Sequence, residues 1–210
     1  MKKISGDVNS IRIDGEMINI KFLVSKDENV YLDVVLYYDD EISDVLSSSG
    51  ELQIRIHCPK KIGRNKASEL TLYLPKGLIF ENVRIDNNMS EIYVACIQTK
   101  QLGIDVDMST ITIEDAIADH LLVSSRMGDF NYSGSINKRA EVKNNKGAIV
   151  MNLNNVETEV GYYAKNAMGD LAVGKNRHSG FSGLLEGNKG APVFLDLRSS
   201  MGDIKVIFKK

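Results

Sequence analysis

The sequence predicts an all-β protein built as a solenoid, in which short strands stack rung upon rung. Three observations predict this fold: an element that recurs every 19 residues, period-2 alternation of apolar residues on both sides of it, and the lack of a long helical apolar stripe. The chain has 210 residues, 43% of them hydrophobic. A folded domain of this length buries roughly 70% of its unfolded surface, so stability requires neither disulfides nor a metal.

The repeat centres on a Ser or Gly that follows a methionine in five of six copies. The first four copies begin at residues 89, 108, 127 and 146, at intervals of 19 residues, and two more begin at 168 and 201. Periods of about 20 residues or more are typical of solenoids, because a single repeat cannot bury its apolar side and must stack on its neighbours. We therefore expect rungs of about 19 residues.

Apolar residues occupy fixed places on both sides of the Ser or Gly. The residue five places before it is apolar in every copy: Ile85, Ile104, Val123, Val142, Ala164 and Leu197. The residue two places after it is apolar as well: Ile92, Ile111, Phe130, Ile149, Leu171 and Ile204. This alternation predicts two half-buried strands per repeat. Ile85, Ile104, Val123 and Val142 should form one stacked and buried column, while Asp86, Asp105 and Lys143 face outward.

The Ser or Gly marks the corner between the two strands of a repeat. Glycine tolerates positive φ, and serine is a common turn residue. Because Ser90 and Ser109 stand where Gly128 stands in a later copy, we expect similar backbone corners throughout. A polar residue three places before the corner, such as Asn87 or Asn144, suits hydrogen bonds between stacked turns.

Two other columns at the corner invite a metal-binding interpretation. The methionines resemble a ladder of soft metal ligands, but adaptable packing is favoured because no Cys or His joins the column. The Asp that follows the corner in three copies, as at Asp129, resembles a calcium ligand. However, Thr110 and Ala148 interrupt that column, and the nine-residue calcium repeat is absent. The sequence therefore predicts turn chemistry, with no metal and no cofactor.

Residues 1–77 do not follow the 19-residue period. They contain alternating segments that predict strands at 11–14, 18–23, 30–37, 52–58 and 70–74. We expect antiparallel strands that pair beside the solenoid or cap its open end, because an uncovered end exposes core and unpaired backbone groups. The predicted division is an N-terminal β region over 1–77 and repeats over 78–210, in one continuous unit. The glycine-rich segment 174–191 is expected to be a mobile loop or a degenerate repeat.

Composition and charge exclude several classes of function. With 26 basic and 28 acidic side chains and no run of five like charges, the sequence lacks the concentrated Lys and Arg of a nucleic-acid-binding or membrane-binding arm. Neither a signal peptide nor a transmembrane run of about 18 apolar residues is found, which predicts a chain that is cytoplasmic if full-length. Cys58 and Cys96 are too far apart for a zinc site, and both are expected to be buried, inert thiols.

The corners of the later repeats carry a family resemblance. Three of them have the form Met-Gly-Asp-apolar: Met127-Gly128-Asp129-Phe130, Met168-Gly169-Asp170-Leu171 and Met201-Gly202-Asp203-Ile204. With the N-terminal β region before them, they resemble the putative-adhesin family of bacterial β-helix domains over roughly residues 11–210. The resemblance implies a right-handed parallel β-helix and an association with the bacterial envelope, and it brings no catalytic residues.

Two functions fit such a solenoid. A non-catalytic interaction or scaffold module would present its long regular face to a protein or a cell-envelope glycan. The alternative is a polysaccharide lyase or hydrolase, since parallel β-helices also host such enzymes, although that link is an analogy between folds. We favour the non-enzymatic module, because no Ser-His-Asp set, P-loop or dinucleotide motif is found.

Outward positions before the first corners give one candidate site. Its residues carry charge and lie on three successive repeats: Arg84, Asp86, Asp105, Asp107 and Arg126. Neighbouring rungs lie about 4.8 Å apart, so Asp86 and Asp105 are close enough to repel each other, raise a pKa or share a cation. Three carboxylates and an arginine can bind calcium and polarise a uronic acid. We favour the alternative of a solvated sheet face whose charges Arg84 and Arg126 balance.

Overall fold

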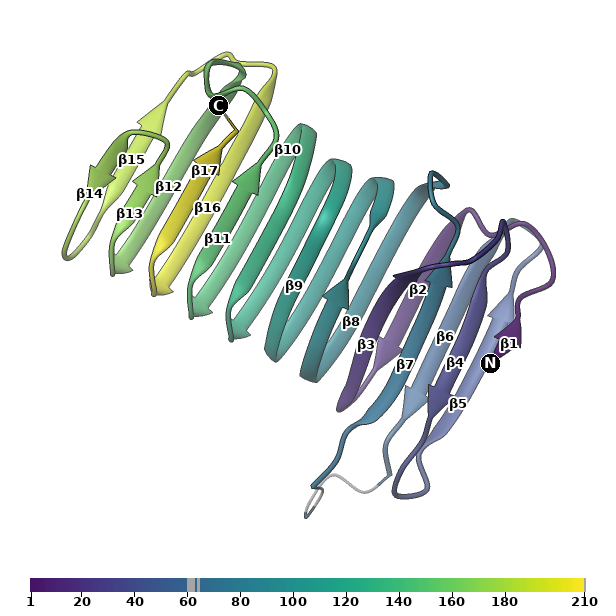
Figure 1. Ribbon diagram of the computed structural model, residues 1–210. Coiled ribbons are helices and arrows are strands. Elements are labelled where there is room, and N and C mark those ends of the chain that lie inside the picture. The colour runs from purple at the N-terminus through teal and green to yellow at the C-terminus, as the bar shows by residue number, and fades with distance from the viewer. Residues whose placement is uncertain (60–62, 64, 210) are drawn as a thin grey trace.

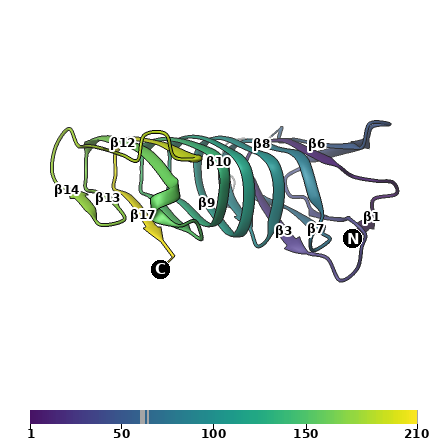
Figure 2. The same cartoon turned by 90° about the horizontal axis from the view of Figure 1, so that it is seen from above.

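The protein is an elongated stack of β-strands (Figure 1). The structure is a computed structural model that describes residues 1–59, 63 and 65–209. Within those residues it contains 17 strands, one short 3-10 helix and no α-helix. Seen from above, the ribbon winds through successive turns that enclose a common interior (Figure 2). The prediction of an all-β fold is confirmed. No helix in the described part of the chain has the length and apolar character needed to cross a membrane.

The strands fall into three groups along the chain. The N-terminal strands are β1 (Lys2–Lys3), β2 (Ser10–Gly15), β3 (Ile18–Val24), β4 (Tyr31–Val35), β5 (Glu41–Leu46), β6 (Glu51–His57) and β7 (Ser68–Leu74). The central strands are long and turn corners: β8 (Ile79–Val94), β9 (Ile97–Met127) and β10 (Phe130–Lys146). The C-terminal elements are β11 (Ile149–Leu153), the 3-10 helix η1 (Glu157–Glu159), β12 (Val160–Met168), β13 (Leu171–Val173), β14 (Asn176–His178), β15 (Leu184–Gly187), β16 (Val193–Met201) and β17 (Ile204–Phe208).

The central rungs pair in parallel, and partners differ by 19 residues over most of their length. β8 aligns Val83 with Leu102 of β9, and beyond the corner it aligns Ile92 with Ile111. The pairing of β9 with β10 follows the same register on both sides of an irregularity near Gly134. Parallel pairing in this register places equivalent residues of successive repeats side by side, on the same face of the sheet.

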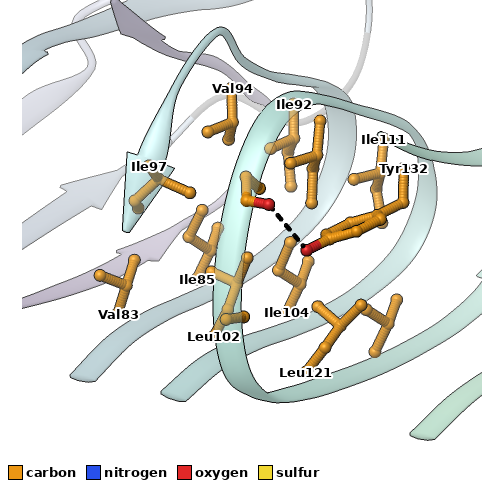
Figure 3. Close-up of a cluster of buried hydrophobic side chains, with 14 of the residues drawn as sticks. Val83, Ile85, Ile92, Val94, Ile97, Leu102, Ile104, Ile111, Leu121 and Tyr132 are labelled. Atoms are coloured by element: carbon orange, nitrogen blue, oxygen red, sulfur yellow. Dashed lines mark hydrogen bonds between the residues drawn. The ribbon is translucent and has the colours of Figure 1, made fainter. Parts of the chain in front are cut away.

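The predicted apolar column is buried in the interior. Strand pairing aligns Ile85 with Ile104, and Val123 with Val142, and the four side chains are 0–4% exposed. Figure 3 shows side chains from the two halves of each rung, such as Ile85 and Ile92, meeting in the space between the faces. The prediction of one buried column is therefore confirmed.

The rungs are not stacked in sequence order at either end of the molecule. The rung of β2 and β3 lies between the rung of β6 and β7 and the rung of β8, since Ile13 pairs with both Ile54 and Ile85. At the other end, the rung of β16 and β17 lies between two other rungs, that of β10 and β11 and that of β12 and β13, as Figure 1 shows for the yellow C-terminal strands. The rung of β2 and β3 and the rung of β16 and β17 are thus paired on both sides.

Antiparallel strands end the stack on both sides. β5 pairs with β6 and β4 with β7 at one end, while β15 pairs with β12 and β14 with β13 at the other. Of the strands predicted in this region, the antiparallel expectation is correct for β4 but wrong for β2, β3, β6 and β7, which continue the parallel rungs. The antiparallel strands β1 and β5 were not predicted. Segment 174–191, expected to be a mobile loop or a degenerate repeat, instead supplies β14 and β15, which cover the edges of the rung of β12 and β13.

The glycine corners differ from the serine corner that the structure describes. Gly128 and Gly147 have φ of 120° and 125°, whereas Ser109 is not among the residues with positive φ. A Cβ atom added to Gly128 would lie 2.1 Å from the carbonyl oxygen of Ser109. The expectation of similar corners is therefore wrong, because at the φ of the later corners a Cβ atom would point at the carbonyl group of the neighbouring rung.

Polar side chains join the stacked corners, as the sequence predicts. The Asn144 amide donates a hydrogen bond to the carbonyl oxygen of Gly128 at 2.8 Å. The Oδ1 atom of Asp129 accepts a hydrogen bond of 2.8 Å from the backbone N–H of Ala148. These contacts assign Asp129 and Asn144 to turn structure.

Candidate functional site

The five predicted site residues lie together on the outward side of one face of the stack. We call this side the ladder face; it belongs to β6, β2, the first halves of β8 and β9, the ends of β9 and β10, β16 and β12. Four of the predicted residues, Asp86, Asp105, Asp107 and Arg126, line a hollow of about 930 Å³. The fifth, Arg84, lines a neighbouring hollow of about 300 Å³ together with Asp105.

Two of the three predicted aspartates are held by arginines. Arg84 donates two hydrogen bonds to Asp86, from Nε to Oδ2 at 2.8 Å and from NH2 to Oδ1 at 2.9 Å. Arg126 Nε lies 3.0 Å from Asp107 Oδ1. The hydrogen bond to Asp86 also raises the pKa of Arg84, with a smaller contribution from Asp105. Two-pronged pairs of this kind fix the orientation of both side chains.

Asp105 is the exception on this face. Strand pairing places it beside Asp86, but it has no ion-pair partner among the described residues. The guanidinium that could reach it, that of Arg84, is directed to Asp86 by two hydrogen bonds. The position two residues before Asp105 is Gly103, where the preceding rung has Arg84. An exposed carboxylate therefore borders both hollows.

The larger hollow also contains residues that the sequence analysis missed. They come from β2, β5 and β6 and the residues next to them, including Arg12, Asp14, Glu41, Arg55 and His57. Arg12 Nε lies 3.2 Å from Asp14 Oδ2, and Arg55 Nε lies 3.8 Å from the same atom. A signal was available, since Arg12-Ile13-Asp14 repeats the Arg-x-Asp spacing of Arg84-Ile85-Asp86, and the two tripeptides are paired in register.

The order of charge along the strands reverses between the two halves of the ladder face. In the N-terminal half the basic residue comes first, as in the Arg84–Asp86 pair. In the same two columns of the C-terminal half the acidic residue comes first: Lys143 Nζ lies 2.7 Å from Glu141 Oε1, and Arg198 Nε lies 2.8 Å from Asp196 Oδ1. Arg139, in a further column, precedes Glu141 and lies 3.8 Å from it. The column of Arg12 and Arg84 thus continues as Glu141 and Asp196, and the column of Asp14 and Asp86 continues as Lys143 and Arg198, so both change sign along the long axis of the molecule.

The rung between these halves is uncharged in these two columns, although it also carries Arg126. Leu122 pairs with Glu141 and Ser124 pairs with Lys143, so the rung that contains Leu122 and Ser124 has no ion pair at these positions. The hollow of about 300 Å³ lies there. In these two columns the ladder face therefore has two oppositely ordered charged regions, joined by the uncharged positions Leu122 and Ser124.

Aromatic rings on the C-terminal half are covered by arginines. The guanidinium of Arg198 lies 5.2 Å from the centre of the Tyr163 ring, and that of Arg139 lies 5.4 Å from the centre of the Phe194 ring. Such cation–π contacts hold the arginines against the sheet. A sugar ring would have to displace an arginine before it could stack on Tyr163.

Neither the aspartates nor the cysteines form a metal site in the part of the chain that the structure describes. No group of three or more His, Cys, Asp or Glu side chains there is arranged to hold a metal ion. Calcium at the predicted site would compete with Arg84 for Asp86. Cys58 is buried as predicted, but the prediction of burial is wrong for Cys96, which is half-buried. Burial, and to a lesser degree Asp115, raises the pKa of the Cys96 thiol.

The stacked parallel rungs and the charged outward face define an all-β repeat protein with an extended surface. The chain belongs to the Toastrack DUF4097 family, which it matches over residues 8–210. Its fold is similar to that of a putative cell adhesion protein from Clostridium sporogenes, with a TM-score of 0.56 and 11% sequence identity over 96% of this chain and 94% of that chain. A putative adhesin from Bacteroides fragilis aligns over 96% of this chain and 93% of its own, with 16% identity and a TM-score of 0.36. No curated protein matches the chain.

Proposed function

We propose that the protein is a non-catalytic, adhesin-like binding module that uses the ladder face to hold a charged protein or glycan of the bacterial envelope. The observation that carries this proposal is the in-register ladder of ion pairs on a continuous sheet, with a hollow of about 930 Å³ in its N-terminal half. The similarity of its fold to that of a protein described as a putative cell adhesion protein supports it.

The geometry favours binding of an extended partner that carries charges of both signs. Outward side chains on neighbouring rungs are spaced by about 4.8 Å, so the face offers charges at regular intervals. The ion pairs already restrict these side chains, which lowers the entropy lost when a partner binds. Complementary charge then selects the partner and its direction, because the two halves of the ladder face have opposite charge order.

We further propose that the complete fold is a right-handed parallel β-helix with rungs of about 19 residues, divided into the regions 1–77 and 78–210. The parallel register supports the rung length, and the strong preference of β-crossovers for one hand supports the handedness. The pairing of β2 with β8 supports one continuous unit.

A binding screen with matched charge variants tests the proposal. The purified protein is screened against acidic, neutral and zwitterionic envelope glycans and against charged peptides, at low and at raised salt. We expect a ligand whose affinity falls as salt rises and falls again in Asp105→Arg. Glu91→Arg, on the second half of β8, makes the same change of charge off the ladder face and should leave binding intact.

The screen also distinguishes the enzymatic alternative. Glycan hits are incubated with the protein and their length is followed over time. Turnover of a glycan that Asp105→Asn abolishes would replace the proposal with the polysaccharide-active enzyme. If Asp105→Arg and Glu91→Arg weaken binding equally, the ladder face is not the binding surface.

A further inference from the structure

A row of exposed methionines runs along the corner between the two faces of the stack. Met89, Met108, Met127, Met168 and Met201 are 37–47% exposed. They are five of the eight methionines in the chain. Packing at the corner, the role that the sequence favours, covers about half of each side chain and leaves the rest exposed, while the core at the corners is filled by other columns, such as Ile92 and Ile111.

Strand pairing gives the spatial order of the row. Met89 pairs with Met108, and Met127 follows Met108 by one repeat within β9. Lys146 pairs with Met127 on one side and with Met201 on the other, and Met201 pairs with Met168. Three methionines on consecutive rungs are thus separated by one lysine from a further pair.

The rung spacing suits a metal ion held between thioethers. Two sulfur atoms bonded to one ion at about 2.3 Å, the length of zinc–sulfur bonds, lie at most about 4.6 Å apart. Neighbouring rungs are spaced by about 4.8 Å, so Met89 and Met127, two rungs apart, are separated by about 9.6 Å. Their side chains must each lean toward Met108 by about 2.5 Å, which three rotatable bonds per methionine allow. Thioethers are soft, neutral ligands that select Cu(I) over harder ions.

We propose that Met89, Met108 and Met127 form a binding site for a soft monovalent cation, Cu(I) or Ag(I). The Met168–Met201 pair forms a second, weaker site with two ligands. The ammonium group of Lys146 keeps the two sites separate, because it places a positive charge between them. Since thioethers release no proton on binding, affinity at both sites is independent of pH, unlike that of a cysteine site.

Methyl NMR tests the proposal on the unaltered chain. The protein is labelled with ¹³C at the methionine methyl groups and titrated with Ag(I). We expect the methyl signals of Met89, Met108 and Met127 to shift first, those of Met168 and Met201 later, and that of the buried Met151 to stay in place. Signals that do not respond at equimolar Ag(I), or that all respond alike, would overturn the proposal.

Competition with a chromophoric Cu(I) chelator, without oxygen, measures the affinity. Met108→Leu keeps an apolar side chain of similar volume and removes only the central sulfur, so we expect affinity to fall by about tenfold or more. Met151→Leu is the matched control and should change nothing. A Cys96→Ser background removes the partly exposed thiol. Cu(I) affinity that survives Met108→Leu, or that disappears in Cys96→Ser, would contradict the proposed site.

Discussion

Replacing Gly128 with serine tests how closely the rungs approach at the glycine corners. Gly128 has φ of 120°, a region that other residues rarely adopt, and this strain costs about 1–3 kcal/mol. The added Cβ would also lie 2.1 Å from the carbonyl oxygen of Ser109. Relief of that contact stretches rung hydrogen bonds such as the 2.9 Å bond from Ile111 N–H to the Asp129 carbonyl, each worth about 1 kcal/mol.

We therefore expect Gly128→Ser to lower the free energy of unfolding by about 2–4 kcal/mol. Urea unfolding measures it, as a lower midpoint with an unchanged slope. The matched control is Ser109→Ala at the equivalent corner, where the hydroxyl is buried without a hydrogen-bond partner. That change should be neutral or slightly stabilising. Equal stability of Gly128→Ser and the wild type would refute the close approach of the rungs.

Three further predictions concern the buried column, the aspartates of the candidate site and the Cys96 thiol. Val123→Asp places an unpaired charge in the buried column and should cost about 3 kcal/mol or more, whereas Ser124→Asp, one residue away and exposed, should stay within about 0.5 kcal/mol of wild type; similar thermal shifts for both would contradict the column. Millimolar calcium should not raise the melting temperature, and Asp105→Asn should be neutral or slightly stabilising, because it removes a like-charge neighbour of Asp86. A calcium-dependent stabilisation lost in Asp105→Asn would restore the cation site. Because the pKa of Cys96 is raised in the folded state, the neutral thiol contributes stability at low pH that is lost as pH rises through the folded pKa. The rate of Cys96 alkylation should accordingly rise with pH around a midpoint above that of an ordinary thiol. A midpoint at or below the ordinary value would contradict the rise in pKa by burial.

The sequence predicts the central rungs well, because their information is local and repeated. Ile85 and Ile104 fall in one column since the period and the alternation agree. The order of the terminal rungs is not predictable in this way. Leu197 pairs with both Val142 and Ala164, and all three are apolar residues of the same column, so periodicity alone cannot tell which rung lies between the others.

The missed parts of the fold and site depend on partners distant in sequence. β5 has Ile42, Val45 and Leu46 without clean alternation, and it is a strand because β6 offers it an edge. The five predicted site residues were identified only from their outward-facing positions in the repeat. Arg12 and Asp14 were missed because they lie outside the period, although their spacing matches that of Arg84 and Asp86. The exposure of the methionine row follows from the shape of the corner, which the residue types do not reveal.

An exchange of charges within one ion pair tests the role of the ladder face most directly. The double variant Arg84→Asp with Asp86→Arg keeps the net charge and the ion pair. It also brings opposite charges beside Arg12 and Asp14, the strand partners of these two residues. The measurement is its affinity for the ligand found in the binding screen, together with its melting temperature. We expect stability equal to or slightly above that of the wild type, because like-charge neighbours are removed, and affinity reduced by at least about tenfold, because the order of charge is reversed. Unchanged affinity in a folded double variant would contradict recognition by the ladder face.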